Sequence, residues 1–432
     1  MIECLIFIIM ECLLGLFVTM TGVSDLYPEI ISILVLGTGT VMVICIFWKK
    51  TTQNSQFIIL LSGYMIRIIC MMMDIYGRKL ISLPNTNPDS DGFYKVACYY
   101  YQNISDQQYT RYPYIINSIF RFWGMNRVVA QYSNIIVWVL CVLLLMKFIG
   151  KFKLGGNAKM VLLFLMALWP NYILATMQLQ RESLITFFNF FAFYSLIEWL
   201  DGKKMRWLIL SFVSAIPATL LHSASVVIIA ANAVIIAVWS RKEKKIKLSG
   251  KTLFIIVFAI VGLFALFYSP LKNIFLTYMS FDQLNWRTIY NSYTRWFNPG
   301  GSDYLRNMQV NNLFEFIIAT VIRMVYFMIS PVPWEWRGLQ DAFAFLSDSL
   351  IYIALLFFII YRLLKIQDKC QKAYILFGLL YSAAFAGIFC WGTSNAGTAM
   401  RHRSIMTCFI IATAAIASSK EKKEEKDGKK IL

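Results

Sequence analysis

The residues best suited to chemistry are two aspartates in one short turn. Asp89 and Asp91 are separated by a single serine within the segment 83–97, which begins Leu-Pro-Asn-Thr-Asn-Pro. One such carboxylate could take a proton from a hydroxyl group as a general base, and two together could bind a divalent cation. An aspartate in a turn can equally close an Asx-turn or cap the helix that follows. Taken alone, the turn favours this structural interpretation.

Basic side chains that could hold a phosphate form a second group. Arg401, His402 and Arg403 follow a turn rich in Gly, Ser, Asn and Thr, whose backbone N–H groups can also donate to phosphate oxygens. Arg181 and Glu182 precede an apolar segment. There the arginine could bind a phosphate while Glu182 orients it, or it could extend into the lipid headgroups with a local ion pair.

Two further groups allow more than one interpretation. His222 stands between two apolar segments, where it could contact a phosphate, relay a proton or form a helix–helix hydrogen bond. Trp334, Glu335 and Arg337 lie in the turn 331–337, and the tryptophan suits either an interfacial aromatic belt or a sugar-stacking surface. Because the chain has only two histidines and no His/Cys cluster, we expect no zinc site.

The elements that must position these residues are apolar segments. The chain of 432 residues is 59% hydrophobic and 15% charged, whereas soluble proteins average about 25% charged residues. Apolar runs recur at close to the roughly 20 residues that cross a bilayer, and they are apolar on every side, which excludes a β-barrel. We expect an all-α polytopic integral membrane protein with about 12 transmembrane helices: 4–22, 29–48, 56–74, 133–150, 159–177, 183–200, 206–222, 223–240, 252–269, 345–364, 373–391 and 404–418.

The charge pattern predicts the orientation of these helices. The formal net charge of +18 would suggest nucleic-acid binding in a soluble protein, but most lysines and arginines lie in short loops between apolar runs, so we expect no nucleic acid. Placing these loops in the cytoplasm puts both termini there. It gives one transmembrane domain, 1–418, and a charged cytoplasmic tail, 419–432. The outer loops are then about 75–132, with Asp89 and Asp91, and about 270–344, and we expect amphipathic helices in both. Residues 178–183, His222 and residues 392–403 fall on the same outer face.

Residues 313–330 are the exception to a simple count of spans. They are apolar enough to cross a membrane, yet Arg323 sits in their middle. If they crossed, the basic loop at 362–372 and the Lys-rich tail would both lie outside, against the positive-inside rule. We therefore expect a re-entrant or interfacial segment here.

Short motifs recur through most of residues 83–415: Asn87–Ala97, Arg111–Gly124, Gln131–Asn134, Gln180–Ile185, Leu221–Ser225, Ser330–Glu335 and Asn395–Arg403. Their order resembles bacterial GT-C-type, polyprenyl-phosphate-dependent glycosyltransferases, the broad group that includes protein mannosyltransferase-like enzymes. A second resemblance, through Arg181-Glu-Ser, Lys203-Lys-Met-Arg206 and Leu221-His-Ser-Ala224, is to EpsG-like and Wzy-like polysaccharide polymerases.

The first resemblance implies an inverting transfer of a sugar from a polyprenyl-(di)phosphate-linked donor to a glycan or lipid-linked acceptor, on the outer face of a bacterial plasma membrane. It implies a catalytic acid at Asp89 or Asp91 and a phosphate site at Arg181, His222, Arg401, His402 and Arg403. The Asp-Ser-Asp spacing departs from the adjacent acidic pair common in protein mannosyltransferases. The alternatives are a repeat-unit polymerase and a lipid-linked oligosaccharide flippase, and flippases more often carry charges at mid-membrane and internal repeats.

Overall fold

Six helices in the described part of the chain are long and apolar enough to cross a membrane, which marks the protein as membrane-embedded. The computed structural model describes residues 27–80, 83, 88–104, 111–247, 250, 252, 254, 302–305 and 308–420. The six are α2 (Tyr27–Lys50), α3 (Asn54–Tyr76), α6 (Arg127–Ile149), α9 (Glu182–Leu200), α17 (Lys369–Phe389) and a continuous helix, 339–365. This last helix comprises α15 (Leu339–Ala344), a π-helical turn (Phe345–Ser349) and α16 (Leu350–Lys365).

The remaining expected spans have other forms or lie outside the described residues. Residues 159–177 form a pair of helices bent by 46°, α7 (Gly156–Leu168) and α8 (Pro170–Met177). Residues 206–240 form two shorter apolar helices, α10 (Arg206–Leu221) and α11 (Val227–Val238), followed by the two-residue strands β1 (Trp239–Ser240) and β2 (Lys245–Ile246), which pair antiparallel. The expected spans 4–22 and, almost entirely, 252–269 lie outside the described residues. Twelve crossings therefore remain a prediction.

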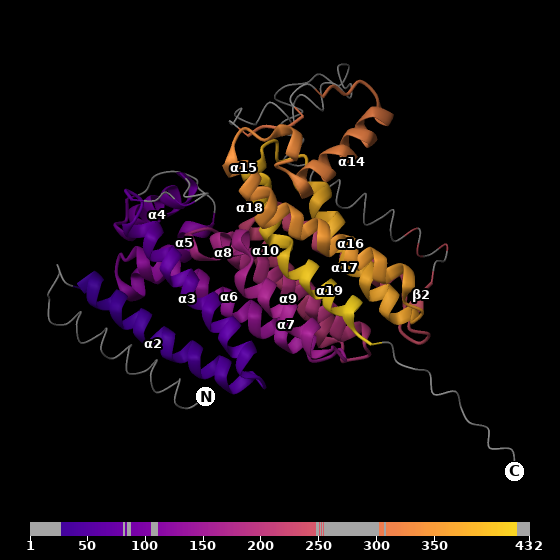
Figure 1. Ribbon diagram of the computed structural model, residues 1–432, viewed down its shortest axis with the longest axis horizontal. Coiled ribbons are helices and arrows are strands. Elements are labelled where there is room, and N and C mark those ends of the chain that lie inside the picture. The colour runs from indigo at the N-terminus through magenta and orange to yellow at the C-terminus, as the bar shows by residue number, and fades with distance from the viewer. Residues whose placement is uncertain are drawn as a thin grey trace, which may run out of the picture.

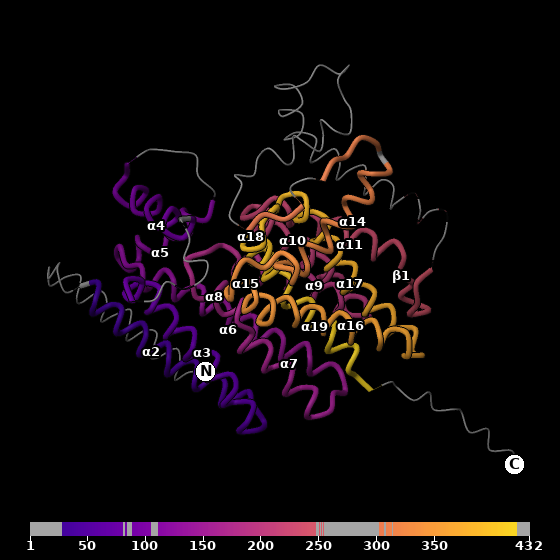
Figure 2. The backbone as a smooth tube through the Cα atoms, turned by 45° about the horizontal axis from the view of Figure 1, so that its top comes forward, coloured from indigo at the N-terminus to yellow at the C-terminus, as the bar shows by residue number. Residues whose placement is uncertain are grey.

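The last helix, α19 (Thr407–Ser418), occupies the core of the bundle. Every residue from Thr407 to Ala417 is buried, as expected of a helix that is apolar all round. Figures 1 and 2 show α2 and α3 on one side of the bundle, α16 and α17 on the other, and α9 and α19 between them. Figure 1 also shows α4 (Pro88–Tyr101) and α5 (Tyr112–Trp123), two helices of the first expected outer loop, beside the end of α3.

The bundle has two chemically different ends. Helices α3, α8, α10 and α17 run toward one end, which we call the site end because it holds Asp89, Glu182 and Arg401. Helices α2, α6, α9 and α16 run toward the other, which we call the basic end. The basic end carries Lys50, Lys151 and Lys203, and Lys151 pairs there with Glu198 at 2.7 Å. These lysines thus lie at the opposite end of the bundle from Asp89, Glu182 and Arg401, and which end faces the cytoplasm stays a prediction.

The bend between α7 and α8 follows from Pro170. Proline lacks the N–H that would bond to the carbonyl of Met166, and its ring displaces the chain. The indole Nε1 of Trp138 donates to the Met166 carbonyl at 3.0 Å, and Nη1 of buried Arg67 donates to the Ala167 carbonyl at 2.6 Å. Backbone carbonyls in a membrane protein need such partners because lipid supplies none. Arg67 is therefore a structural group within a predicted span.

Gly63 of α3 is expected to tolerate no side chain, because α3 packs closely against α7 there. A Cβ at this position would lie 2.7 Å from both the Cβ and the carbonyl oxygen of Ala167. Gly63→Ala should lower the melting temperature of the detergent-purified protein, at a cost of about 1–3 kcal/mol for overpacking. Gly37→Ala, where a Cβ meets nothing within 4 Å, is the matched control and should be neutral or stabilising. Equal melting temperatures for the two variants would contradict this packing.

Helix α14 (Leu313–Ile329) does not run through the bundle. Phe316 stacks on Trp391 with ring centroids 4.6 Å apart, and Phe327 stacks on Phe389 at 6.1 Å, so both halves of α14 contact the site end of α17. Arg323 is buried and donates to the carbonyl of Cys390 at 3.0 Å, just beyond the end of α17. Figure 1 shows α14 projecting at a steep angle to α16 and α17. These contacts place α14 across the site end of α17, and its interfacial or re-entrant position in a membrane stays a prediction.

Candidate functional site

The two aspartates of the first outer loop lie in the first turn of α4. Proline is favoured at the first position of a helix, where its missing N–H needs no partner. Acidic residues in the first turn interact favourably with the positive end of the helix dipole. The turn is thus a helix start, as the structural interpretation expects. However, Asp89 and Asp91 bind different partners, and this separates two residues that sequence reasoning treats alike.

Asp91 anchors α4 to the helices beneath it. It accepts a hydrogen bond from Nη1 of Arg78 at 2.8 Å, and its other oxygen lies 2.6 Å from Nη1 of Arg127. Burial by itself would raise the pKa of Asp91, but the hydrogen bonds and charges of the two arginines outweigh it and lower the pKa. Arg78 also contacts the buried Asp74 at 3.1 Å, which in turn accepts from Gln131 at 3.0 Å. Asp91, whose side chain is 48% exposed, therefore belongs to an ion network with two arginines.

Asp89 instead contacts a buried arginine from the far end of the sequence. Its carboxylate pairs with Nη1 of Arg401, and Nε of Arg401 donates to Oε1 of Glu182 at 2.6 Å. The side chain of Asp89 is 52% exposed, whereas those of Arg401 and Glu182 are 8% and 0% exposed. We call these three residues the Asp–Arg–Glu cluster. It joins α4, α9 and α18 (Ala396–Arg403).

The break between α8 and α9 positions Glu182. Residues 178–181 are not helical, so their carbonyls need other donors. Nδ2 of Asn134 donates to the carbonyls of Gln178 and Gln180 at 2.6 and 2.9 Å. Nε2 of Gln131 donates to Met177 at 3.1 Å. Gln131 and Asn134 are three residues apart and share one face of α6. Sequence reasoning missed this supporting role, which polar residues at that spacing in an apolar helix could have indicated.

Arg181 and the two histidines lie beside the cluster. Nη1 of Arg181 donates to the carbonyl of Leu221 at 3.1 Å, next to His222. The rings of His222 and His402 are 5.6 Å apart and both contact Phe389. Burial lowers the pKa of His402 well below its ordinary value, and the charges of neighbouring groups, including Arg401 and Arg181, lower it further. His402 is therefore neutral at pH 7, so it is not the cation that the Arg-His-Arg sequence suggests.

Acid is expected to destabilise the protein through His402. The folded state keeps this side chain neutral, while the unfolded chain takes up a proton below about pH 6.5. The contribution of neutral His402 to the free energy of unfolding is fully present above that pH. It is lost as the pH falls toward the lowered pKa of His402 in the folded state. His402→Gln should therefore lose less thermal stability than the unmodified protein between about pH 7.5 and about pH 5. Parallel pH dependences of the two melting temperatures would contradict this expectation.

Arg403 lies outside the cluster, which corrects its expected role as a phosphate ligand. Its side chain is 0% exposed and pairs with the buried Asp348 at 2.6 Å. Its Nη1 and Nη2 donate to the carbonyls of Phe327 and Ser330 at 3.1 and 2.8 Å. Arg403 thus joins α18 to α14 and to the helix 339–365. A buried guanidinium with these partners is a structural group.

The turn containing Trp334, Glu335 and Arg337 is also separate from the cluster. Trp334 is 70% exposed and donates to the hydroxyl of Tyr326 at 3.2 Å, and Arg337 pairs with Asp341 at 3.2 Å. Glu335 and Arg337 line a cavity of about 350 Å³ together with Ala396, the first residue of α18. This turn therefore borders the first residue of the helix that carries Arg401.

No group of three or more His, Cys, Asp or Glu side chains within the described residues is arranged to hold a metal ion. Asp89 and Asp91 face arginines rather than each other. Such pairs differ from the convergent oxygen ligands that a divalent cation requires. A divalent cation at these two aspartates stays a prediction.

The fold and the site together define a membrane-embedded helical protein with an ionic Asp–Arg–Glu cluster at one end of its bundle. No protein-family model matches the chain, and no curated protein or solved structure matches it either.

Proposed function

We propose that this protein is a membrane glycosyltransferase that moves a sugar from a polyprenyl-(di)phosphate-linked donor to a hydroxyl of a glycan or lipid-linked acceptor. The observation that carries the proposal is the Asp–Arg–Glu cluster. A half-exposed carboxylate and a buried guanidinium, from residues 312 positions apart, meet at the end of the bundle that we expect to face outward. One group suits proton removal and the other suits a phosphate.

The reaction proceeds by displacement at the anomeric carbon of the donor sugar. Asp89 takes the proton from the acceptor hydroxyl as its oxygen bonds to that carbon. The bond between the carbon and the phosphate oxygen breaks, and the lipid phosphate leaves with the electron pair. Arg401 and Arg181 stabilise the negative charge that grows on this phosphate, which is the usual electrostatic strategy for such a step.

In the proposed reaction, the donor phosphate replaces Asp89 as a partner of Arg401. Arg401 faces two carboxylates, so one guanidinium charge is shared between two acids. Glu182 is fully buried and remains in place, whereas the exposed Asp89 can be displaced by a donor phosphate. Displacement frees the Asp89 carboxylate for the acceptor hydroxyl. Binding of the phosphate to Arg401 and release of the Asp89 carboxylate from Arg401 then occur together.

One buried polar atom of the cluster and another beside it further support a bound ligand. Within the described chain, Nε2 of Gln180 and Oε2 of Glu182 have no hydrogen-bond partner. Buried polar atoms normally find partners, so such atoms next to a functional cluster favour a ligand that supplies them. A sugar, with its hydroxyl groups, can both donate and accept hydrogen bonds here.

The decisive experiment is a deletion in cells followed by analysis of lipid-linked sugars and surface glycans. Loss of one surface glycan with accumulation of its polyprenyl-linked donor is the expected result. Reintroducing the unmodified chain should restore the glycan, and a chain with Asp89→Asn should not. An unchanged lipid-linked pool and unchanged surface glycans would overturn the proposal. Accumulation of the donor on the cytoplasmic leaflet only would indicate a flippase instead.

A further inference from the structure

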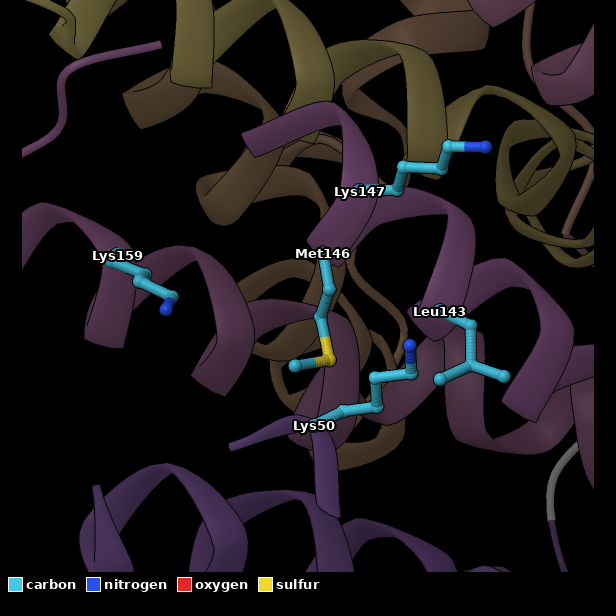
Figure 3. Close-up of a pocket in the computed structure, with 5 residues that line it drawn as sticks. All are labelled: Lys50, Leu143, Met146, Lys147 and Lys159. Atoms are coloured by element: carbon cyan, nitrogen blue, oxygen red, sulfur yellow. The ribbon is translucent and has the colours of Figure 1, made fainter. Parts of the chain in front are cut away.

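A cavity of about 540 Å³ opens at the basic end, away from the Asp–Arg–Glu cluster. Lys50, the last residue of α2, lines it together with Leu143, Met146 and Lys147 from the final turns of α6 and Lys159 from the first turns of α7. Figure 3 shows the side chains of Lys50 and Met146 lying between these helices. The cavity thus lies where three helix ends meet, and its lining contains three amines and two apolar side chains.

The lysines of this cavity form no ion pair with a carboxylate in the part of the chain that the structure describes. This differs from the neighbouring Lys151 and Lys203, which pair with Glu198 at the same end. Lys147 turns its ammonium toward the rings of Tyr194 and Trp207, at 5.6 and 5.8 Å, and Figure 3 shows it pointing away from Lys50. The ammonium groups of Lys50 and Lys159 therefore remain to bind a ligand in the cavity.

The lysines could serve only as helix-end charges, or they could bind a ligand, and the shape and lining of the cavity decide between these two roles. Lysines at the ends of α2 and α6 complement the helix dipoles and mark the cytoplasmic side, but neither of these effects requires a cavity. Here the charges frame a cavity whose wall, Leu143 and Met146, is half-buried and apolar. An anion that carries a hydrocarbon chain satisfies both parts of such a lining. Basic pockets between transmembrane helices on the cytoplasmic side bind anionic lipid headgroups in this way.

We propose that this cavity binds an anionic glycerophospholipid of the surrounding leaflet. Lys50 and Lys159 hold the headgroup phosphate, and an acyl chain packs on Leu143 and Met146. The lipid bridges α2 to α6 and α7. Such a bridge suits α2, because only 28% of its most apolar stretch is buried inside the protein. The bound lipid therefore stabilises a peripheral helix, and this role is independent of the reaction proposed at the site end.

The test compares the full-length protein in detergent with added dioctanoyl phosphatidylglycerol, dioctanoyl phosphatidylcholine or inorganic phosphate. Phosphatidylglycerol is expected to raise the melting temperature saturably, and the other two are not. The variant pair Lys50→Gln and Lys159→Gln should bind phosphatidylglycerol about 30-fold more weakly, or about 2 kcal/mol, at about 1 kcal/mol per lysine. The matched control, Lys204→Gln with Lys242→Gln, removes two exposed lysines near the same end and should bind as the unmodified protein does.

The outcomes separate the lipid site from its rivals. Equal affinity of the cavity pair and the control pair would show that net charge alone attracts the lipid, and would overturn the site. An equal rise in melting temperature with inorganic phosphate would reveal a free-anion site and would overturn the lipid assignment. A rise with phosphatidylcholine that survives in the cavity pair would show non-specific lipid solvation, with the same consequence.

Discussion

Asp89→Asn is expected to abolish glycan synthesis while leaving the protein folded. The asparagine keeps the size of the side chain and can still contact Arg401, but it cannot accept the proton of an acceptor hydroxyl. Loss of a general base typically lowers the rate by about 10²–10⁴-fold. The rate of product formation from the lipid-linked donor that accumulates in deletion cells measures this effect. The melting temperature should change little, because the Asp89 side chain is 52% exposed.

Asp91→Asn is the matched control, since it makes the same chemical change two residues away. This variant weakens the ion network with Arg78 and Arg127 and leaves both arginines beside Asp74. We expect a lower melting temperature and faster hydrogen exchange in α4, with a much smaller loss of turnover per folded molecule. If Asp91→Asn removed turnover and Asp89→Asn retained it, the assignment of the base would be reversed. Full turnover in both variants would eliminate a general base at this turn.

The sequence predicts the helical scaffold well, because lipid imposes simple rules on length and polarity. The expected spans 29–48, 56–74, 133–150, 183–200, 345–364 and 373–391 all appear as long apolar helices. The rules of length and polarity do not apply to a segment that is surrounded by protein rather than by lipid. Helix α19 is only 12 residues long and still central, since it is buried by its neighbours on every side.

The composition of the site is less predictable than the scaffold. The pattern of basic loops predicts that Asp89, Glu182 and Arg401 lie on the same face of the membrane, but only the packing of α4, α9 and α18 brings the three together. Arg401 and Arg403 look equivalent in the sequence. They are two positions apart on a helix and therefore point in different directions, so one reaches the cluster and the other reaches Asp348. Which carboxylate each arginine pairs with depends on contacts between residues far apart in the sequence, and the local sequence pattern does not predict these contacts.

Arg401→Ala is expected to cause the largest loss of stability among single substitutions in the cluster. It leaves the fully buried Glu182 without its cation, and removing one partner of a buried ion pair costs about 3–5 kcal/mol. It also removes the group that we propose stabilises the departing phosphate. Activity and folding should therefore fail together, and the single variant cannot separate the two roles. The melting temperature and the expression level measure the structural part.

A double variant separates them. Arg401→Met with Glu182→Gln removes both buried charges while keeping similar side-chain volumes, and such replacements are often neutral or stabilising. We expect this protein to recover most of its melting temperature and still lack turnover and binding of the lipid-linked donor. Glu182→Gln alone keeps the guanidinium and Asp89, so it should retain donor binding. If the double variant regained turnover along with stability, Arg401 would be a structural residue and the phosphate would have to bind elsewhere, with Arg181 as the nearest remaining cation.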